Sequence, residues 1–324
     1  MIQLPSPAQY FPLERPLYEV APGLRPFGQD LGNGPLEEKL FQVDCHYHSA
    51  IQNKADCRAE RISKYCVTDP AFTPELEQFV VRWMARRLVK ESPEFFSLIE
   101  DASGGKNLGL ENHLTGARIQ LSPHEDGHVS SWDAITSQVQ EDLAIQIRGP
   151  GPDQDRLVAL HLCSPSHWAA EDKIGLNFRA IHAPIPGVEK MNRAAPQLVQ
   201  AMIDKGPYIR FVWGFATDHR LNHHPIAPPG VDPVEWHGRA YAADRPENPF
   251  SLRVERQVIW GLPEVNASLF VIRVSFIEGS VIREKPEWRD LLIGALKSMS
   301  PESRVYKGLQ GSMPQVLEWL GGRS

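Results

Sequence analysis

Apolar residues follow a helical period in a long stretch that begins near residue 74. Thr73-Pro74-Glu75 combines an N-cap residue, a proline at the first helical position and an acidic first turn. The apolar positions that follow are Leu76, Phe79, Val80, Trp83, Met84 and Leu88. This spacing predicts a helix over 74–90 with one buried stripe.

Five further segments have helical patterns, and the third of them has a proline in its interior. They cover residues 132–143, 169–181, 189–204, 285–298 and 313–321. Pro196 predicts a kink in the third of these segments, because a proline removes one hydrogen bond of the helix.

Four segments rich in branched and aromatic residues predict strands, at 156–163, 208–215, 252–260 and 268–277. The last two are separated by residues 261–266, which is the length of a hairpin connection, so they are expected to pair antiparallel. Strands in one run with helices before and after them indicate an α+β fold with an antiparallel sheet.

Two proline-rich segments lie outside this pattern. Residues 1–37 predict an extended arm that lies on the body of the protein. Residues 223–249 predict a long functional loop, since they exceed the length of a normal connection. No clean linker divides the remainder, so residues 38–324 are expected to form a single domain.

Composition and charge narrow the class of protein. Of the 324 residues, 42% are hydrophobic and 23% are charged, as in soluble globular proteins. A net charge of −6 gives no basis for binding nucleic acid or an anionic membrane. Four cysteines make no disulfide framework, and no signal peptide or transmembrane segment is evident. We therefore expect a cytoplasmic protein that acts on a small molecule.

Common metal and nucleotide motifs give little support for a site. Cys45-His46-Tyr47-His48, with Cys57 and Cys66, gathers soft ligands but lacks the close cysteine pair of a structural zinc site. The glycines at Gly104-Gly105 do not match a phosphate-binding loop, and His223-His224 lies in the proline-rich loop as an isolated pair.

One histidine is held rigidly by its sequence context. His182 ends the predicted helix over 169–181 and is followed by Pro184 and Pro186. A metal-binding imidazole needs such restraint. The same position also suits a protonated histidine that interacts with the helix dipole, so the residues alone leave both roles open.

A polar strand forms the second candidate site. Alternation along 252–260 places Arg253, Glu255 and Gln257 on one face of the strand and Arg256 on the other. The first face could bind carboxylates or an amine, or could simply face solvent. Arg273 on the neighbouring strand adds another cation.

Several short motifs in order resemble the haem-dependent oxidative N-demethylase family over most of residues 40–310. They are FQVD near Phe41, QVQEDL at 138–143, SPSHW…KIGLNFRAIHAPIPG at 164–187, FVWGF in the strand 208–215, the RVERQ…LP…LFVIR hairpin and YKGL at 306–309. The order of the motifs, together with the IHxPxPG and RxERQ pair, supports the resemblance.

The resemblance implies a PAS-like antiparallel sheet with added helices, and haem b held between helix and sheet. His182 becomes the expected axial ligand of the iron, with His161 on the strand 156–163 as the second candidate. The expected contacts to the haem and its propionates are Arg253, Arg273 and Trp213.

The implied reaction is oxidative demethylation of a small methylated amine with O₂, giving formaldehyde and the shorter amine. From charge alone, Glu255 is expected to hold the protonated amine, and Arg256 is a second catalytic candidate. The chain has no flavin, nicotinamide or iron–sulfur motif, so electrons are expected from a separate flavin and iron–sulfur reductase.

Two alternatives remain, a PAS-type haem sensor and a small-molecule binding protein without turnover. The chain also departs from the family at one place. Val274-Ser275 follows Arg273 where the family usually has Thr-Tyr, which would alter the substrate scope or the activity if that tyrosine touches the ligand.

Overall fold

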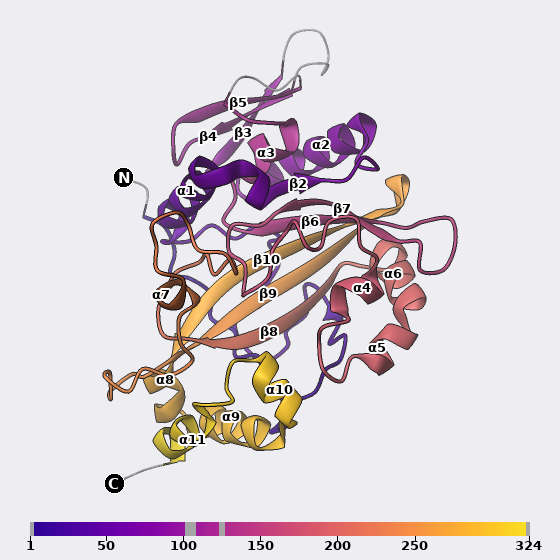
Figure 1. The fold of residues 1–324 in the computed structure, drawn as a ribbon. Helices are drawn as coiled ribbons and strands as arrows, with labels where there is room; N and C mark the ends of the chain where they lie inside the picture. The colour runs from indigo at the N-terminus through magenta and orange to yellow at the C-terminus, as the bar shows by residue number, and fades with distance from the viewer. Residues whose placement is uncertain (1–2, 101–107, 123–126, 322–324) are drawn as a thin grey trace.

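The large antiparallel sheet organises the molecule in the computed structural model, which describes residues 3–100, 108–122 and 127–321 (Figure 1). Its strand order is β1-β8-β9-β10-β6-β7-β2, and every pairing is antiparallel. The strands are β1 (Arg25–Pro26), β2 (Cys66–Thr68), β6 (Asp142–Ile147), β7 (Arg156–His161), β8 (Tyr208–Ala216), β9 (Ser251–Leu262) and β10 (Ala267–Glu278). The expected α+β class with a large antiparallel sheet is confirmed, as are the strands predicted near 208–215, 252–260 and 268–277.

The β9–β10 hairpin fixes which side chains share a face of the sheet. A short 3₁₀ turn over Pro263–Val265 joins the strands, and Asn266 takes the left-handed backbone (φ 51°) that asparagine tolerates. The register sets Arg273 opposite Arg256 and Val274 opposite Glu255. Residues directly opposite each other lie on the same face, so Glu255 and Val274 point to one side of the sheet and both arginines to the other.

We call the side that carries Glu255 the front face and the side that carries Arg256 the back face. The helices α4 (Phe178–His182), α5 (Glu189–Arg193) and α6 (Ala195–Asp204) cover part of the front face (Figure 1). Their apolar side chains pack on Ile259 and Phe270 of the sheet. The front face is therefore only partly enclosed, and Arg210, Val212 and Glu255 stay half-buried.

The back face is covered at both ends. At one end, α2 (Pro74–Glu91) and α3 (Ser131–Thr136) enclose sheet residues such as Leu269 and Val271. At the other end, α8 (Gly279–Glu284), α9 (Pro286–Ser298), α10 (Pro301–Tyr306) and α11 (Met313–Gly321) close the chain. Of these, α8, α9 and α11 pack with Leu252 and Val254 of β9.

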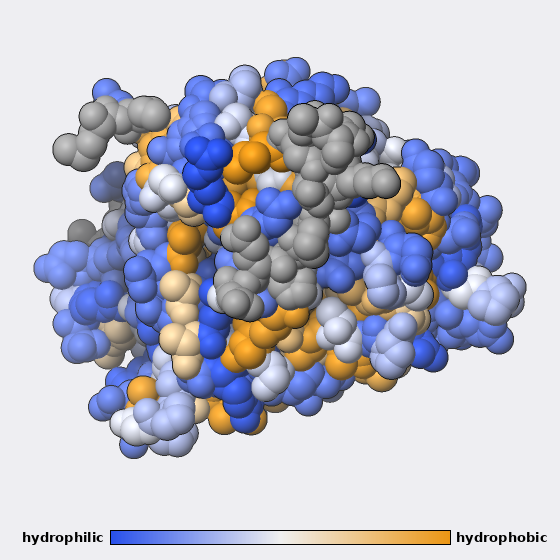
Figure 2. Space-filling model, turned by 90° about the horizontal axis from the view of Figure 1, so that it is seen from above, coloured by the Kyte–Doolittle hydropathy of each residue, from blue (hydrophilic) through white to orange (hydrophobic). Residues whose placement is uncertain are grey.

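A second layer lies beyond α2, and most of it was not predicted. It contains α1 (Tyr47–Tyr65) and the small sheet β3 (Phe96–Glu100), β4 (Leu108–Asn112) and β5 (Ala117–Ser122). Figure 2 shows this end of the molecule from above, with hydrophilic residues around the rim and hydrophobic residues nearer the middle of the view. The strands are short and α1 is strongly polar, so neither gives a clear hydrophobic period.

The predicted helices differ in how well they match the structure. The helix over 74–90 is confirmed as α2, with Thr73 accepting a hydrogen bond from the Leu76 amide, and 285–298 and 313–321 are confirmed as α9 and α11. The segment 189–204 is interrupted at Ala194, just before Pro196, which divides it into α5 and α6.

Two helices are shorter than predicted. The helix expected over 132–143 ends at Thr136, whose hydroxyl bonds to the Trp132 carbonyl, and β6 begins at Asp142. The helix expected over 169–181 is replaced by turns up to Asn177, and only α4 follows. Gly175 interrupts the expected helix with a left-handed backbone (φ 79°). The strand expected over 156–163 is also shorter, since β7 ends at His161.

The two proline-rich segments have little regular structure. Residues 3–37 run extended along the body, and β1 at Arg25–Pro26 pairs with β8. The loop 223–249 contains the short helix α7 (Pro233–His237). The glycines at Gly104-Gly105 lie outside the described residues. Among the described residues, no helix has the length and apolar character needed to cross a membrane.

Candidate functional site

His182 lies at the end of a short, firmly anchored helix beside the front face. Asn177 caps α4 by accepting a hydrogen bond from the Ala180 amide, and its own amide group donates to the Asp153 carbonyl. The Phe178 amide donates to Asp155 Oδ2 over 2.7 Å. Three contacts at its first turn thus fix the direction in which this five-residue helix presents its last side chain.

The imidazole of His182 has a defined tautomer. Its Nδ1 lies 2.7 Å from the Phe178 carbonyl oxygen, and a carbonyl can only accept, so Nδ1 carries the hydrogen. Burial lowers the pKa of His182 to about 4, and the nearby charges of Arg210 and Lys173 act in the same direction. The ring is therefore neutral at pH 7 with the lone pair on Nε2, which is the form that binds a metal.

Two cations from other elements approach the same region. Arg210, on β8, lies close to both His182 and Glu255. Its positive charge lowers the pKa of His182, and the Glu255 carboxylate acts to raise the pKa of Arg210. Lys307 follows α10 and donates from Nζ to the Trp213 carbonyl over 2.5 Å. Burial lowers the pKa of Lys307 to about 8, while the Glu255 carboxylate opposes this shift and Arg210 adds to it.

Arg210 lacks a hydrogen-bonding partner among the described residues. Its Nε is buried and makes no hydrogen bond, and burial lowers the pKa of the guanidinium despite the charge of Glu255. A buried N–H donor without an acceptor is costly. This side chain is therefore well suited to an anionic group of a ligand.

Glu255 is held in place by two neighbours on the front face. Its Oε1 accepts from the Ser166 hydroxyl and its Oε2 accepts from the Gln257 amide, each over 2.7 Å. Arg253 in turn donates from Nε to the Ser166 oxygen over 2.8 Å. The carboxylate therefore has a fixed orientation, and lies close to the charges of Arg210 and Lys307.

Arg253 is fully engaged with the chain itself. Besides Ser166, its guanidinium donates to backbone carbonyls of two loops, those of Ser164, Pro165, Arg220 and Leu221. The side chain thus joins these loops to β9 and orients Ser166 toward Glu255.

The other expected site residues lie on the back face. Arg256 forms an ion pair with Glu37 at 3.3 Å and donates to the Lys39 and Leu40 carbonyls. Arg273 pairs with Asp44 at 2.8 Å. Burial raises the pKa of Asp44, but the Arg273 guanidinium, with the hydrogen bonds from Gln140 and the His46 amide, holds that pKa below its usual range.

Trp213 and His161 also point away from Glu255. Trp213 packs in the apolar core under the C-terminal helices. His161 is completely buried beside Asp133 of α3. The structure therefore brings together His182, Arg253 and Glu255 of the expected set, and places Arg256, Arg273, Trp213 and His161 on the opposite side of the sheet.

The departure at Val274-Ser275 is divided between the two faces. Val274 lies directly across from Glu255 on the front face, and Ser275 points to the back. Sequence reasoning missed Arg210 and Lys307, although Lys307 belongs to the YKGL motif and Arg210 occupies the front-facing alternation of β8.

A comparison with known families covers almost the whole chain. A family model described as haem-dependent oxidative N-demethylase, alpha subunit-like, matches residues 35–317. The matched region includes α4 with His182, the β9–β10 hairpin and Lys307. The chain therefore belongs to the haem-dependent oxidative N-demethylase alpha subunit-like family.

Proposed function

We propose that the chain binds haem b between α4 and the front face of a PAS-like sheet and demethylates a small methylated amine such as dimethylamine. The observation that carries the proposal is the neutral imidazole of His182, anchored through Nδ1, beside the unpartnered guanidinium of Arg210. Membership of the family makes haem the expected cofactor.

The residues on the front face suit the parts of a haem. The Nε2 of His182 would bind the iron, and the Phe178 ring packs against the imidazole at 4.2 Å between centroids with a tilt of 35°. Arg210 and Lys307 would pair with the propionates, since both are cations without a carboxylate in hydrogen-bonding contact among the described residues. Arg253 acts indirectly, because its donors are already used to hold Ser166.

When bound, haem supplies the activation of O₂ and the oxidising power that hydroxylates an N-methyl carbon. Glu255 would bind the protonated amine through its carboxylate, whose orientation is fixed by Ser166 and Gln257. The apolar side chains of Ile181 and Ile185, beside His182, would keep water from the reacting methyl group. The hydroxylated methyl group leaves as formaldehyde when its C–N bond breaks.

The electrons would come from a partner. The described site residues include no group that could donate them, and the family name designates an alpha subunit. We infer that a flavin and iron–sulfur reductase, as a subunit or a separate protein, reduces the iron, and that the reaction takes place in the cytoplasm.

The test is the visible spectrum of the full chain produced with haem precursor, before and after dithionite. We expect about one haem per chain in the wild type and loss of stoichiometric haem in His182→Ala. His48→Asn is the matched control and should keep its haem, because this exposed histidine lies on α1, in the layer beyond α2. Full retention of haem in His182→Ala would remove His182 as the ligand.

Turnover separates an enzyme from a sensor. With dimethylamine, O₂ and an electron donor, the haem-loaded wild type should release formaldehyde in proportion to the amine consumed. Haem binding without formaldehyde from any of a series of methylated amines would instead favour a haem sensor.

A further inference from the structure

Three side chains of types that bind metals lie together on the back face of the sheet, away from His182. Cys66 begins β2, His161 ends β7, and Asp133 belongs to α3. Cys66 and His161 are directly opposite each other in the pairing of β2 with β7. One ligand atom from each of the three residues lies within 4.8 Å of the others.

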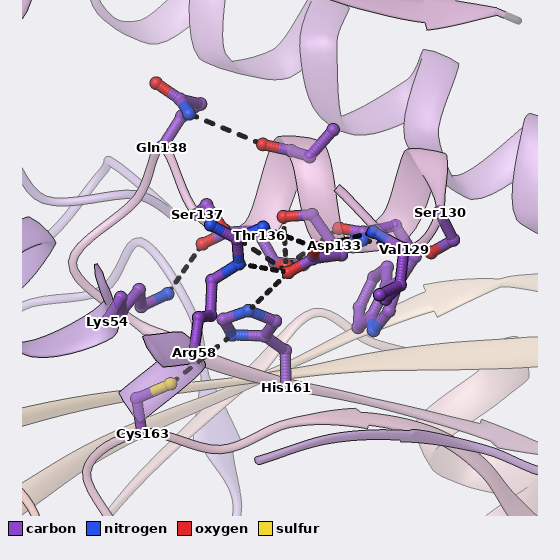
Figure 3. Close-up of polar contacts among 12 residues, drawn as sticks. Lys54, Arg58, Val129, Ser130, Asp133, Thr136, Ser137, Gln138, His161 and Cys163 are labelled. Carbon is purple, nitrogen blue, oxygen red and sulfur yellow. Dashed lines mark hydrogen bonds and ion pairs between the residues drawn. The ribbon is translucent and has the colours of Figure 1, made fainter. Parts of the chain in front are cut away.

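The cluster is shielded from solvent. Asp133 and His161 have no exposed surface, and Cys66 is largely buried. Figure 3 shows Asp133 and His161 pointing toward each other, with Arg58 beside the carboxylate.

His161 has one satisfied nitrogen and one without a hydrogen bond. Its Nδ1 contacts the Cys163 sulfur at 3.9 Å. Its Nε2 lies 3.4 Å from Asp133 Oδ1 but makes no hydrogen bond there. A buried nitrogen in this state requires a partner, and none of the described residues supplies one with good geometry.

The spacing of these atoms suits two ligands of one tetrahedral ion. Two bonds of about 2.0 Å at a tetrahedral angle place their donor atoms about 3.3 Å apart. The observed 3.4 Å between His161 Nε2 and Asp133 Oδ1 matches this separation. A sulfur, an imidazole and a carboxylate together are a zinc ligand set, whereas Mg²⁺ and Ca²⁺ select oxygen.

The surrounding groups orient the ligands from behind. Arg58 donates from Nε and Nη2 to the two oxygens of Asp133, each over 3.0 Å, and the Val129 amide donates to Oδ2. The Cys163 sulfur contacts the other ring nitrogen of His161, Nδ1, at 3.9 Å, so Nε2 is the nitrogen that faces Asp133. Arg58 also adds a positive charge that balances the carboxylate and the thiolate together with the ion.

We propose that Cys66, Asp133 and His161 bind a zinc ion, with water in the fourth position. The site is separate from the haem site, because His161 and Glu255 lie on opposite faces of the sheet. The ion would fasten α3 to β2 and β7, and so join the N-terminal layer to the large sheet.

The experiment measures metal in the full-length, untagged chain after incubation with zinc and removal of loosely bound ions by gel filtration. Zinc per chain is determined by mass spectrometry for the wild type and three variants, Cys66→Ser, His161→Asn and Cys57→Ser. Cys57→Ser is the matched control, since this cysteine is also buried but contacts the Cys163 carbonyl and lies outside the proposed ligand set.

We expect about one zinc per chain in the wild type and in Cys57→Ser, and a loss of nearly all of it in Cys66→Ser and His161→Asn. A folded wild type that takes up no zinc after incubation with the ion would overturn the proposal. So would a full equivalent of zinc in Cys66→Ser.

X-ray absorption at the zinc edge of the wild type decides the matter even if the variants fail to fold. One sulfur at about 2.3 Å, with nitrogen and oxygen at about 2.0–2.2 Å, is the expected first shell. A shell without sulfur would place the zinc elsewhere on the chain and contradict the site.

Discussion

Both faces of the large sheet carry arginine side chains, but these differ in whether the chain itself supplies their ion-pair and hydrogen-bond partners. On the back face, Arg256 and Arg273 each form an ion pair with a carboxylate and also bond to backbone carbonyls. On the front face, Arg210 has neither kind of contact among the described residues. Both states are found within three adjacent strands, so the strand itself does not decide the role of a charge.

The difference teaches where a binding group can be recognised. A guanidinium whose donors bond to the chain itself holds segments of the chain together. Arg273 of β10, for example, holds Asp44, which lies just before α1. A guanidinium whose buried Nε lacks an acceptor, beside a neutral and anchored histidine, is suited to bind an anionic group of a ligand. By this criterion the back-face arginines hold the chain together, and the front face is the surface on which we propose that the ligand binds.

Arg273→Met should produce the largest effect on stability. It leaves the buried carboxylate of Asp44 without its counter-ion, which typically costs about 3–5 kcal/mol of the free energy of unfolding. Urea unfolding measures the loss, and haem per folded chain should stay as in the wild type.

The double variant Asp44→Asn with Arg273→Met is the control for this prediction. It should recover part of the lost stability, because no buried carboxylate is left uncompensated. The opposite pattern, normal stability with lost haem, would show that Arg273 binds a propionate and that the two faces are not divided as proposed.

Glu255→Gln should affect binding on the front face and leave stability nearly unchanged. A hydrogen bond to a charged group is worth about 1.5–3 kcal/mol, so amine binding should weaken on the order of tenfold to a hundredfold. Titration of the haem spectrum with the amine measures this change.

Glu278→Gln is the matched control for amine binding, since Glu278 lies on the same face at the far end of β10. Its affinity should equal that of the wild type. Equal affinity in Glu255→Gln would show that the amine is held elsewhere.

Much of the sheet could be predicted from sequence, because its long strands carry clear apolar patterns. The β9–β10 hairpin follows from two such runs and a short connection, and its alternation already separates Glu255 from Arg256. That alternation also argued against grouping Arg256 with Glu255 in one site. The register then sets Arg273 beside Arg256, which no single strand can reveal.

The parts that could not be predicted depend on contacts between distant segments. Lys307, which follows α10, bonds to the Trp213 carbonyl of β8, and these two residues are 94 positions apart in the sequence. Cys66, Asp133 and His161 come from three separate elements, so their spacing in sequence matches no metal motif. The apolar and polar pattern of a single element does not show which distant elements it will pack against.

Lys307→Met should give the smallest effect, and its pH dependence tests the front face directly. Because burial lowers the pKa of Lys307 from 10.5 to about 8, the unfolded chain binds a proton between these pH values that the folded chain does not. The free energy of unfolding therefore gains a contribution that rises with pH across this window and is absent below about pH 8. The difference between wild type and Lys307→Met, measured by urea unfolding at a series of pH values, isolates this contribution from other groups.

The same measurement on the haem-saturated chain tests whether Lys307 lies beside a propionate. A propionate beside Lys307 would favour its ammonium form and raise its pKa, so the window should narrow and move upward when the chain is saturated with haem. Curves for wild type and Lys307→Met that run parallel from pH 7 to 10.5 would contradict the lowered pKa. A window that haem leaves unchanged would place Lys307 away from the propionates, and the binding surface would then consist of His182, Arg210 and Glu255 alone.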